Sequence, residues 1–423
     1  MEWSRLLSRE RFGSSGRADE ARTAFERDYG RILFSNPFRR LHNKTQVFPV
    51  PENDHIHSRL THSLEVADVG RTLGHQVGLR LADALGSADP RDLGDVVAAA
   101  CLAHDIGNPP FGHAGEDAIG HFFEQGGGKR WADELPQQQA DDLRYFEGNA
   151  QGFRIIARLE MYRHDGGMRL SAATLGAFTK YPQSSLRRKD RSRPASGKKY
   201  GFFASDQAAF AGVAEACGLP QHADDAWARH PLAFLMEAAD DICYHVLDLE
   251  DGFELRLVDE ATTYDGFARL LERPLSEVSG KPIGMLRAQA ISALVAQVVD
   301  VFCAEHEAIL AGSYEQALTD SIPAAAAMSH VFDEVNMPLC YRAPLVLSLE
   351  QAGYRVIGSL LEIFLDSLLG DSRRRVHQMI PGLDATDDLY ARIQLVLDYI
   401  SGMTDRYAVK LYRQLTGIEL SSF

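Results

Sequence analysis

The sequence has few cysteines, and no two of them lie close together in the sequence, so it does not suggest a disulfide framework. Most of the five lie among apolar neighbours, far from one another, at Cys101, Cys217, Cys243, Cys303 and Cys340. An odd number of separated cysteines predicts reduced core residues rather than zinc ligands.

A long apolar run is also missing. The longest uninterrupted one, Val96 to Ala103, is far shorter than the roughly 20 residues that a membrane span needs. The charged start Met1-Glu-Trp-Ser-Arg5 lacks the apolar core of a signal peptide. We therefore expect a cytoplasmic protein with no membrane partner.

Positive charge is in short supply, because the formal net charge is −15. A field of this sign opposes nonspecific adhesion to nucleic acid and to anionic membranes. Two local clusters of basic residues are exceptions to this negative charge: Arg187 to Arg193 with Lys198 and Lys199, and Arg373 to Arg375. The first fits a nucleic-acid contact and a solvated loop equally well, whereas the second fits a helix end better.

The 423 residues, 45% hydrophobic and 24% charged, predict a globular chain. Apolar residues recur three and four apart, as in the stripe Val356, Leu360, Phe364 and Leu368, so we predict an all-α fold. Two glycine- and proline-containing stretches, 125–139 and 181–201, interrupt this pattern and predict loops or lids, the second with a short β-hairpin. We expect a catalytic core over residues 1–255 and a helical extension over residues 256–423.

The most informative stretch runs from His104 to Glu116. An adjacent His104-Asp105 pair is weak evidence alone, but His62 and Asp240 lie in two other helix-like segments. On helices, His62, His104 and Asp240 would each lie on an apolar face, and a buried aspartate is costly unless it is paired or binds a metal. Each residue alone also fits a purely structural role, such as a core histidine or a helix-end carboxylate. Together they have the order His, His-Asp, Asp that is typical of HD-type metal-dependent phosphohydrolases.

Two imidazoles and two carboxylates suit Mn²⁺, Fe²⁺ or Zn²⁺, and Mg²⁺ where substrate phosphate adds oxygen ligands. Such an ion lowers the pKa of a bound water and neutralises phosphoryl charge. Asn108 precedes Pro109-Pro110, so the ligand helix must end there and the chain must turn back over the metal. His113 and Glu116 then share one side of the next helix, where they suit proton transfer or form an exposed capping pair.

The chain resembles the deoxyguanosinetriphosphate triphosphohydrolase family from about Trp3 to the C-terminus. The segments that carry this resemblance are Phe25-Glu-Arg-Asp-Tyr-Gly-Arg31, Arg39-Arg-Leu41, Lys44-Thr-Gln-Val-Phe-Pro49, Arg59-Leu-Thr-His-Ser-Leu-Glu65, Ala103-His-Asp-Ile-Gly-Asn-Pro-Pro-Phe-Gly-His113, Phe146-Glu-Gly-Asn-Ala-Gln151, Thr179-Lys-Tyr-Pro182, Lys199-Tyr-Gly-Phe-Phe203, Asp240-Asp-Ile-Cys-Tyr244 and Asp398-Tyr-Ile-Ser-Gly-Met-Thr-Asp-Arg406. These segments together are far more specific than the metal tetrad.

The resemblance implies an all-helical HD fold that hydrolyses a deoxynucleoside triphosphate to the deoxynucleoside and inorganic triphosphate. It implies a divalent metal, Mn²⁺ or Mg²⁺, at His62, His104, Asp105 and Asp240. His113 and Glu116 match the catalytic pair, whose histidine is described as acid, base or nucleophile.

The resemblance also implies substrate contacts. Gln46 and Asp248 match contacts to the 3′-hydroxyl side of the sugar, and Tyr244 matches the residue packed against C2′. Arg59 and Lys180 match phosphate contacts. Independently, Asp240, Tyr244 and Asp248 repeat every four residues, so one helix face would run from metal to sugar. Glu147 and Asn149 match the family sequence without a role that we can assign.

Two other functions stay open at this point. One is an HD-type nucleotide phosphomonoesterase or phosphodiesterase, which the cationic set Arg59, Lys180 and Lys199 disfavours. The other is a nucleotide-sensing regulator that binds single-stranded DNA, which the intact His113 and Glu116 pair disfavours. The family further implies a homo-oligomer, with a hexamer favoured, and a nucleotide or single-stranded DNA effector. The preferred base does not follow from the motifs.

Overall fold

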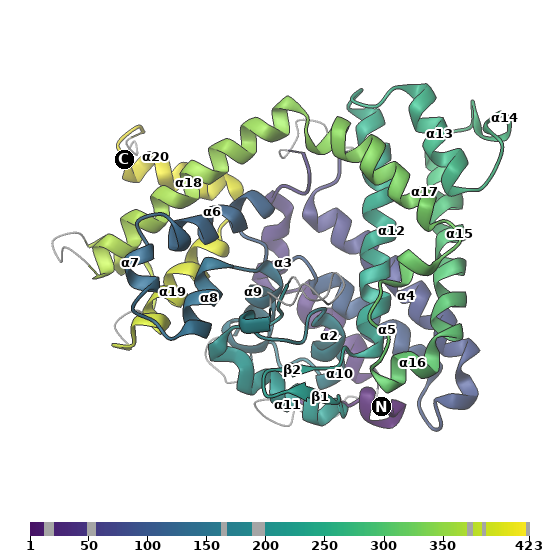
Figure 1. Cartoon of the computed structure of the whole chain (residues 1–423), viewed down its shortest axis with the longest axis horizontal. Coiled ribbons are helices and arrows are strands. Elements are labelled where there is room, and N and C mark those ends of the chain that lie inside the picture. The colour runs from purple at the N-terminus through teal and green to yellow at the C-terminus, as the bar shows by residue number, and fades with distance from the viewer. Residues whose placement is uncertain are drawn as a thin grey trace.

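The computed structural model describes residues 1–11, 21–48, 56–161, 167–187, 199–369, 375–382 and 386–419, and in these ranges most of the chain is helical (Figure 1). The first half contains α1 (Trp3–Leu6), α2 (Ala24–Leu33), α3 (Asn36–Arg40), α4 (Arg59–Arg80), α5 (Pro90–Ala103), α6 (His113–Glu124), α7 (Lys129–Ala132), α8 (Gln137–Arg144), α9 (Gly148–Arg154) and α10 (Ala172–Phe178). The second half contains α11 (Gln207–Cys217), β1 (Gln221–Ala223), β2 (Ala226–Trp227), α12 (Pro231–Glu254), α13 (Glu260–Leu270), α14 (Leu275–Val278), α15 (Ile283–Ala304), α16 (His306–Ala311), α17 (Ala325–His330), α18 (Pro344–Leu369), α19 (Leu389–Ser401) and α20 (Asp405–Leu415).

Wider π-helical turns form η3 (Ile155–Leu159) and η8 (Val331–Tyr341). Single 3₁₀ turns form η1 (Leu41–Asn43), η2 (Ala82–Ala84), η4 (Ser185–Arg187), η6 (Ala204–Asp206), η7 (Leu318–Ser321) and η9 (Val376–Met379). The prediction of an all-α fold is confirmed.

Helices α4 and α5 pack closely because glycines line their contact. A Cβ atom on Gly74 would lie 2.6 Å from the Cα atom of Gly94, so the two backbones approach as only glycine allows. Leu73 and Val97 are fully buried in this layer, and each such side chain contributes about 1.5–3 kcal/mol through burial. The helices that carry His62 and His104 are therefore held firmly side by side.

Helix α12 packs against both α4 and α5, and α15 covers α12 and α4 from the other side. By length and composition α15 is apolar enough to cross a membrane. Its contacts with α4 and α12, and its fully buried Leu286, Leu294 and Phe302, instead favour a helix packed within this fold.

A second apolar cluster joins the C-terminal helices to α6. Helix α18 runs across one edge of the molecule from the side of α12 and α17 to the side of α6 and α7 (Figure 1), and packs on α6, α19 and α20. Its stripe of Val356, Leu360 and Phe364 is buried there, as its periodicity predicts. Residues 256–423 thus contact the preceding part of the chain through several elements, among them α13, α15, η7 and η8 on α12 and α18 on α6.

The described residues of the stretch in which a β-hairpin is predicted, 181–187 and 199–201, form no strand, and residues 188–198 lie outside the described residues. Strands β1 and β2 pair with each other elsewhere in the chain. One local prediction was wrong. Stretch 125–139 is not simply a loop, because it contains α7 and the start of α8. The basic cluster at residues 188–193 with Lys198, and Arg373 and Arg374 of the second cluster, lie outside the described residues.

Candidate active site

Helices α4 and α12 and the turn that follows α5 bring the four predicted metal ligands together. His62 Nε2 lies 3.2 Å from Asp240 Oδ1, and His104 Nε2 lies 3.5 Å from the same oxygen. The second oxygen of Asp105 lies 3.6 Å from His104 Nε2. Ligand atoms of His62, His104 and Asp105 all fall within 4.8 Å of one another. The structure therefore groups all four residues, which are up to 178 positions apart in the chain.

Local structure orients each donor. Ser58 caps α4 through a reciprocal pair of hydrogen bonds with Thr61, so the helix starts just before His62. His104 Nδ1 donates to the carbonyl of Cys101 at 2.6 Å. This bond fixes the tautomer and leaves Nε2 free as a ligand atom, as is usual for metal-binding histidines.

Asp105 shows that this donor set suits a cation. Its Oδ1 accepts from Arg59 Nη1 at 2.8 Å and from the Asn108 amide. Its Oδ2 is buried and has no hydrogen-bond partner among the described residues. A buried, unpaired carboxylate oxygen is costly, and a metal ion shared with the imidazoles would satisfy it.

Neighbouring side chains keep both carboxylates ionised. Burial alone would raise the pKa of Asp240, but the imidazoles of His104 and His62 hold this pKa well below its usual range. Burial likewise opposes ionisation of Asp105, and the Arg59 guanidinium lowers its pKa. The Asp240 side chain is 24% exposed, so a ligand can reach it.

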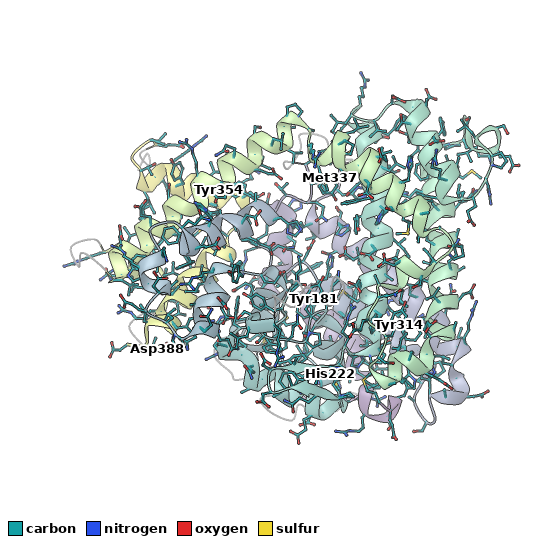
Figure 2. All side chains as sticks on the ribbon, viewed as in Figure 1. Tyr181, His222, Tyr314, Met337, Tyr354 and Asp388 are labelled. Atoms are coloured by element: carbon teal, nitrogen blue, oxygen red, sulfur yellow. The ribbon has the colours of Figure 1, made fainter. Side chains whose placement is uncertain are left out.

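A cavity of 380 Å³ opens over these residues. Tyr181 and Met337, which both line it, are labelled in Figure 2. The cavity is lined by Gln46, Val47, Arg59, His104, Asp105, Asn108, His113, Asn149, Phe178, Lys180, Tyr181, Lys199, Met236, Asp240, Tyr244, Phe332, Met337 and Tyr341. Among the expected substrate contacts, Gln46, Arg59, Lys180 and Tyr244 reach it, and Asp248 does not.

The predicted proton-transfer pair stands at the mouth of this cavity. His113 Nδ1 donates to Glu116 Oε2 at 2.8 Å, and Glu116 Oε1 accepts from the Gly148 N–H at 2.6 Å. Its hydrogen bond to Glu116 raises the pKa of His113. Burial opposes ionisation of Glu116, but His113 lowers its pKa. These two shifts favour the imidazolium–carboxylate form of the pair.

Three cations, Arg59, Lys180 and Lys199, line the cavity. Lys180 Nζ lies 3.4 Å from Glu237 Oε1, and the other oxygen of Glu237 accepts from Arg229 at 2.6 Å. Burial would lower the pKa of Lys180, but Tyr181 and Glu237 raise it well above its usual value. Lys180 is therefore a fixed positive charge.

Aromatic side chains form the wall opposite the cations. Tyr244 stacks on His245 with ring centres 4.2 Å apart and meets the edge of Phe332 at 5.7 Å. Gln46 Oε1 is buried without a partner within the described ranges, so it is available to a ligand. Asp248 accepts from the Tyr341 hydroxyl at 2.5 Å, and burial raises the pKa of Asp248 to about 7. Asp248 therefore does not line the cavity itself and is linked to it by the hydrogen bond from Tyr341.

Sequence reasoning missed the residues that η8 contributes: Phe332, Met337 and Tyr341. The available signal was Pro338, which interrupts a helical apolar pattern, and π-turns often occur at functional sites. Asn149 also lines the cavity, and its side chain donates to Glu147 at 2.7 Å. Lys199 Nζ lies 3.5 Å from the same Glu147 carboxylate, so Glu147 holds two cavity residues in place.

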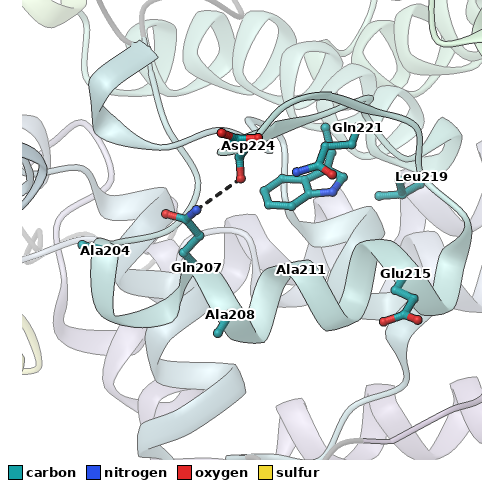
Figure 3. A pocket seen from close by; sticks show the side chains of 9 residues that line it. Ala204, Gln207, Ala208, Ala211, Glu215, Leu219, Gln221 and Asp224 are labelled. Atoms are coloured by element: carbon teal, nitrogen blue, oxygen red, sulfur yellow. Dashed lines mark hydrogen bonds between the residues drawn. The ribbon is translucent and has the colours of Figure 1, made fainter.

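A separate hollow of 660 Å³ lies along α11 beside the paired strands β1 and β2 (Figure 3). Ala208, Ala211 and Trp227 line it, and Gln207 Nε2 donates across it to the carbonyl of Asp224 at 3.3 Å. Its lining contains none of the predicted site residues. The chemistry therefore concentrates in the 380 Å³ cavity.

Two protein-family models match the sequence. The HD domain matches residues 59–194, and a phosphohydrolase-associated domain matches residues 322–414. The first range contains His62, His104 and Asp105, and the second contains Phe332, Met337 and Tyr341.

Full-length relatives match as well. A Pseudomonas aeruginosa protein named deoxyguanosinetriphosphate triphosphohydrolase-like protein is 40% identical over 445 residues, which cover 99% of each chain. A Synechocystis protein of the same name is 42% identical over 446 residues, covering 99% of this chain and 100% of its own. A Yersinia enterocolitica protein named deoxyguanosinetriphosphate triphosphohydrolase is 30% identical over 503 residues, covering 96% and 97%.

Proposed function

Because the chain belongs to the deoxyguanosinetriphosphate triphosphohydrolase-like family of HD-domain proteins, we propose that it hydrolyses a deoxynucleoside triphosphate to the deoxynucleoside and inorganic triphosphate. One observation carries the proposal. A single cavity is lined by metal-binding carboxylate and imidazole groups, by His113 of a proton-transfer pair and by three cations. Attack of water on the α-phosphorus would use all of these groups.

His62, His104, Asp105 and Asp240 would hold the divalent ion, for which we propose Mn²⁺ or Mg²⁺. When bound, the ion would activate water and neutralise phosphoryl charge. Arg59 keeps Asp105 ionised and oriented through its 2.8 Å bond. The side chains around these four residues would bind the phosphates, donate the proton and select the sugar.

The cations would bind the polyphosphate. A guanidinium fork at Arg59 and the fixed ammonium of Lys180 suit phosphate oxygens, and Lys199 adds a third charge to the cavity. A monophosphate would need fewer positive charges. This set therefore favours a triphosphate over the monoester or diester substrates of other HD enzymes.

His113 would protonate the leaving 5′-oxygen. Its Nδ1 is bonded to Glu116, so the imidazolium can release its Nε2 proton to the oxygen that leaves the α-phosphorus. Glu116 would orient the ring and stabilise its charge. Glu116 raises the pKa of the ring, which favours the protonated form that a general acid needs.

The aromatic wall would select the sugar. Tyr244 lies one helical turn after Asp240 on α12, so its ring can pack against C2′ of a sugar whose phosphates lie at the ion. Gln46, with its unpaired Oε1, would bond the 3′-hydroxyl. We propose that Asp248 acts on the same hydroxyl through Tyr341.

We also propose a cytoplasmic homo-oligomer, with a hexamer favoured, that responds to a nucleotide or single-stranded DNA effector. These proposals rest on the family membership. Light scattering of the purified protein with and without added nucleotide tests the oligomer.

A panel of the deoxynucleoside and nucleoside triphosphates, each with Mn²⁺ or Mg²⁺, tests the reaction by chromatography of the products. We expect deoxynucleoside and triphosphate from at least one deoxynucleotide. Orthophosphate or pyrophosphate as the primary product would contradict the proposal. Binding without turnover under all conditions would favour a nucleotide sensor instead.

A further inference from the structure

The seven residues between Asp105 and His113 form a strained loop, here called the donor loop (residues 106–112). Phe111 has φ of +65° and Gly112 has φ of +58°. Glycine adopts this region readily, but a bulky residue such as Phe111 is strained there. Such a conformation persists only when the surroundings impose it. Because the loop links a metal ligand to the proton donor, its position sets the distance between them.

Hydrogen bonds from two distant segments hold this loop. Lys44 is 2% exposed, and its Nζ donates to the carbonyl of Asn108 at 2.6 Å and to that of Ser401 at 2.8 Å. Asp405 Oδ1 accepts from the N–H of Phe111 at 3.0 Å. The loop is therefore held by the side-chain nitrogen of Lys44 near its start and by the carboxylate of Asp405 at its strained residue.

The same two charged residues belong to one connected unit. Asp405 Oδ2 accepts from the backbone N–H of Thr45 at 2.9 Å and from its hydroxyl at 2.5 Å. Thr45 follows Lys44, and Asp405 follows Ser401 by four residues. All of these groups are buried, and buried charge-assisted hydrogen bonds are stronger than neutral ones.

Helix α18 closes the loop from a third side. A Cβ atom on Gly353 would lie 2.5 Å from Cγ of Phe111, so the backbone of α18 rests directly on this ring. Gly353 and Asp405 both lie in the segment that matches the phosphohydrolase-associated domain. The C-terminal segment therefore contacts the donor loop at Phe111 by packing and by hydrogen bonding.

We propose that Lys44 and Asp405 are positioning residues, which hold the donor loop so that His113 faces a substrate bound over the metal ligands. This inference rests on the proposed function. Neither residue lines the cavity, so each acts through the loop. A displacement of His113 by about 1 Å can cost on the order of 10²-fold in rate, whereas His62, Asp240 and Lys180 lie outside the loop.

The test compares Asp405→Ala and Lys44→Met with Thr404→Ala. Thr404 caps the same helix, α20, by accepting from the Tyr407 N–H, and it makes none of the loop bonds. We expect kcat for the best deoxynucleotide to fall on the order of 10²-fold in the first two variants. KM and bound Mn²⁺ should change little, and Thr404→Ala should keep its kcat.

Asp405→Asn keeps an oxygen that can accept from Phe111, so part of kcat should return in that variant. Hydrogen exchange of the peptide spanning the donor loop gives a second readout. Exchange at Phe111 should become on the order of tenfold faster in Asp405→Ala and stay unchanged in Thr404→Ala.

Three results would overturn the positioning role. One is an equal loss of kcat in Thr404→Ala at a matched melting temperature. Another is a loss in Asp405→Ala that appears wholly in KM or in bound Mn²⁺. The third is unchanged exchange of the loop in Asp405→Ala. If the parent protein hydrolyses no deoxynucleotide, the proposed function fails, and the exchange comparison still decides whether Lys44 and Asp405 hold the loop.

Discussion

Replacing Glu116 by glutamine tests whether His113 and Glu116 act together in proton transfer or form only a surface contact. The amide has nearly the same shape, but it offers one acceptor where the carboxylate offers two. In the parent, both carboxylate oxygens accept, one from His113 and one from the Gly148 N–H. If the amide oxygen keeps the bond to Gly148, its NH₂ group faces Nδ1 of His113, which must then lose its proton. The imidazolium form is therefore disfavoured.

The size of the effect follows from the geometry. A charge-assisted hydrogen bond contributes about 1.5–3 kcal/mol when it is buried. The His113 side chain is 77% exposed, so water screens the pair and we take about 1 kcal/mol. This corresponds to somewhat less than one pKa unit. With the added loss of ring orientation, we expect kcat to fall roughly 10- to 100-fold.

The pH dependence of kcat should change in a defined direction in Glu116→Gln. Glu116 raises the pKa of His113, so a general acid at this position stays protonated to higher pH and loses activity above its pKa. In Glu116→Gln this alkaline limb of kcat should move to lower pH, by up to about one unit. Bound metal should not change, because the four proposed ligands are untouched.

Asp117→Asn is the matched control, since it removes an adjacent exposed carboxylate without touching the bond between His113 and Glu116. Steady-state kinetics of both variants between pH 6 and 10, with metal content measured in parallel, make the comparison. An unchanged alkaline limb in Glu116→Gln, or an equal shift in Asp117→Asn, would refute the assigned role.

Three further changes test other parts of the site. Asp105→Ala or Asp240→Ala should abolish both bound metal and turnover, and a variant that keeps full metal by elemental analysis would remove that residue from the ligand set. His113→Ala should keep metal and nucleotide while kcat falls on the order of 10²–10⁴-fold, and an unchanged kcat would leave only a capping role. Tyr244→Ala should lower the ratio of kcat/KM for a deoxynucleotide to that for its ribonucleotide roughly 10- to 200-fold, and equal losses for both would show a packing residue.

Local sequence patterns predicted the helical part of the site well. His62 and Asp240 lie on the inner faces that their apolar neighbours predict, because three- and four-residue spacing fixes which side of a helix is buried. The pairing of His113 with Glu116 also follows from a local rule. The ligand helix was predicted to end at Asn108, but α5 ends five residues earlier, at Ala103.

Local sequence patterns did not predict the contacts between distant segments. Phe332 and Tyr341 reach the cavity because η8 widens around Pro338 and packs against α12, and no local pattern reports that approach. Lys44 and Asp405 are 361 positions apart, and each alone has the appearance of a surface charge. Phe202 and Phe203, the aromatic residues after Gly201, pack in the core as irregular chain rather than as a strand.

Hydrolysis in H₂¹⁸O tests the central claim most directly. If water attacks the α-phosphorus and the bond to the 5′-oxygen breaks, mass spectrometry should find one ¹⁸O atom in the inorganic triphosphate. The deoxynucleoside should contain none. Label in the 5′-hydroxyl of the deoxynucleoside, or in orthophosphate released from the γ position, would contradict the account.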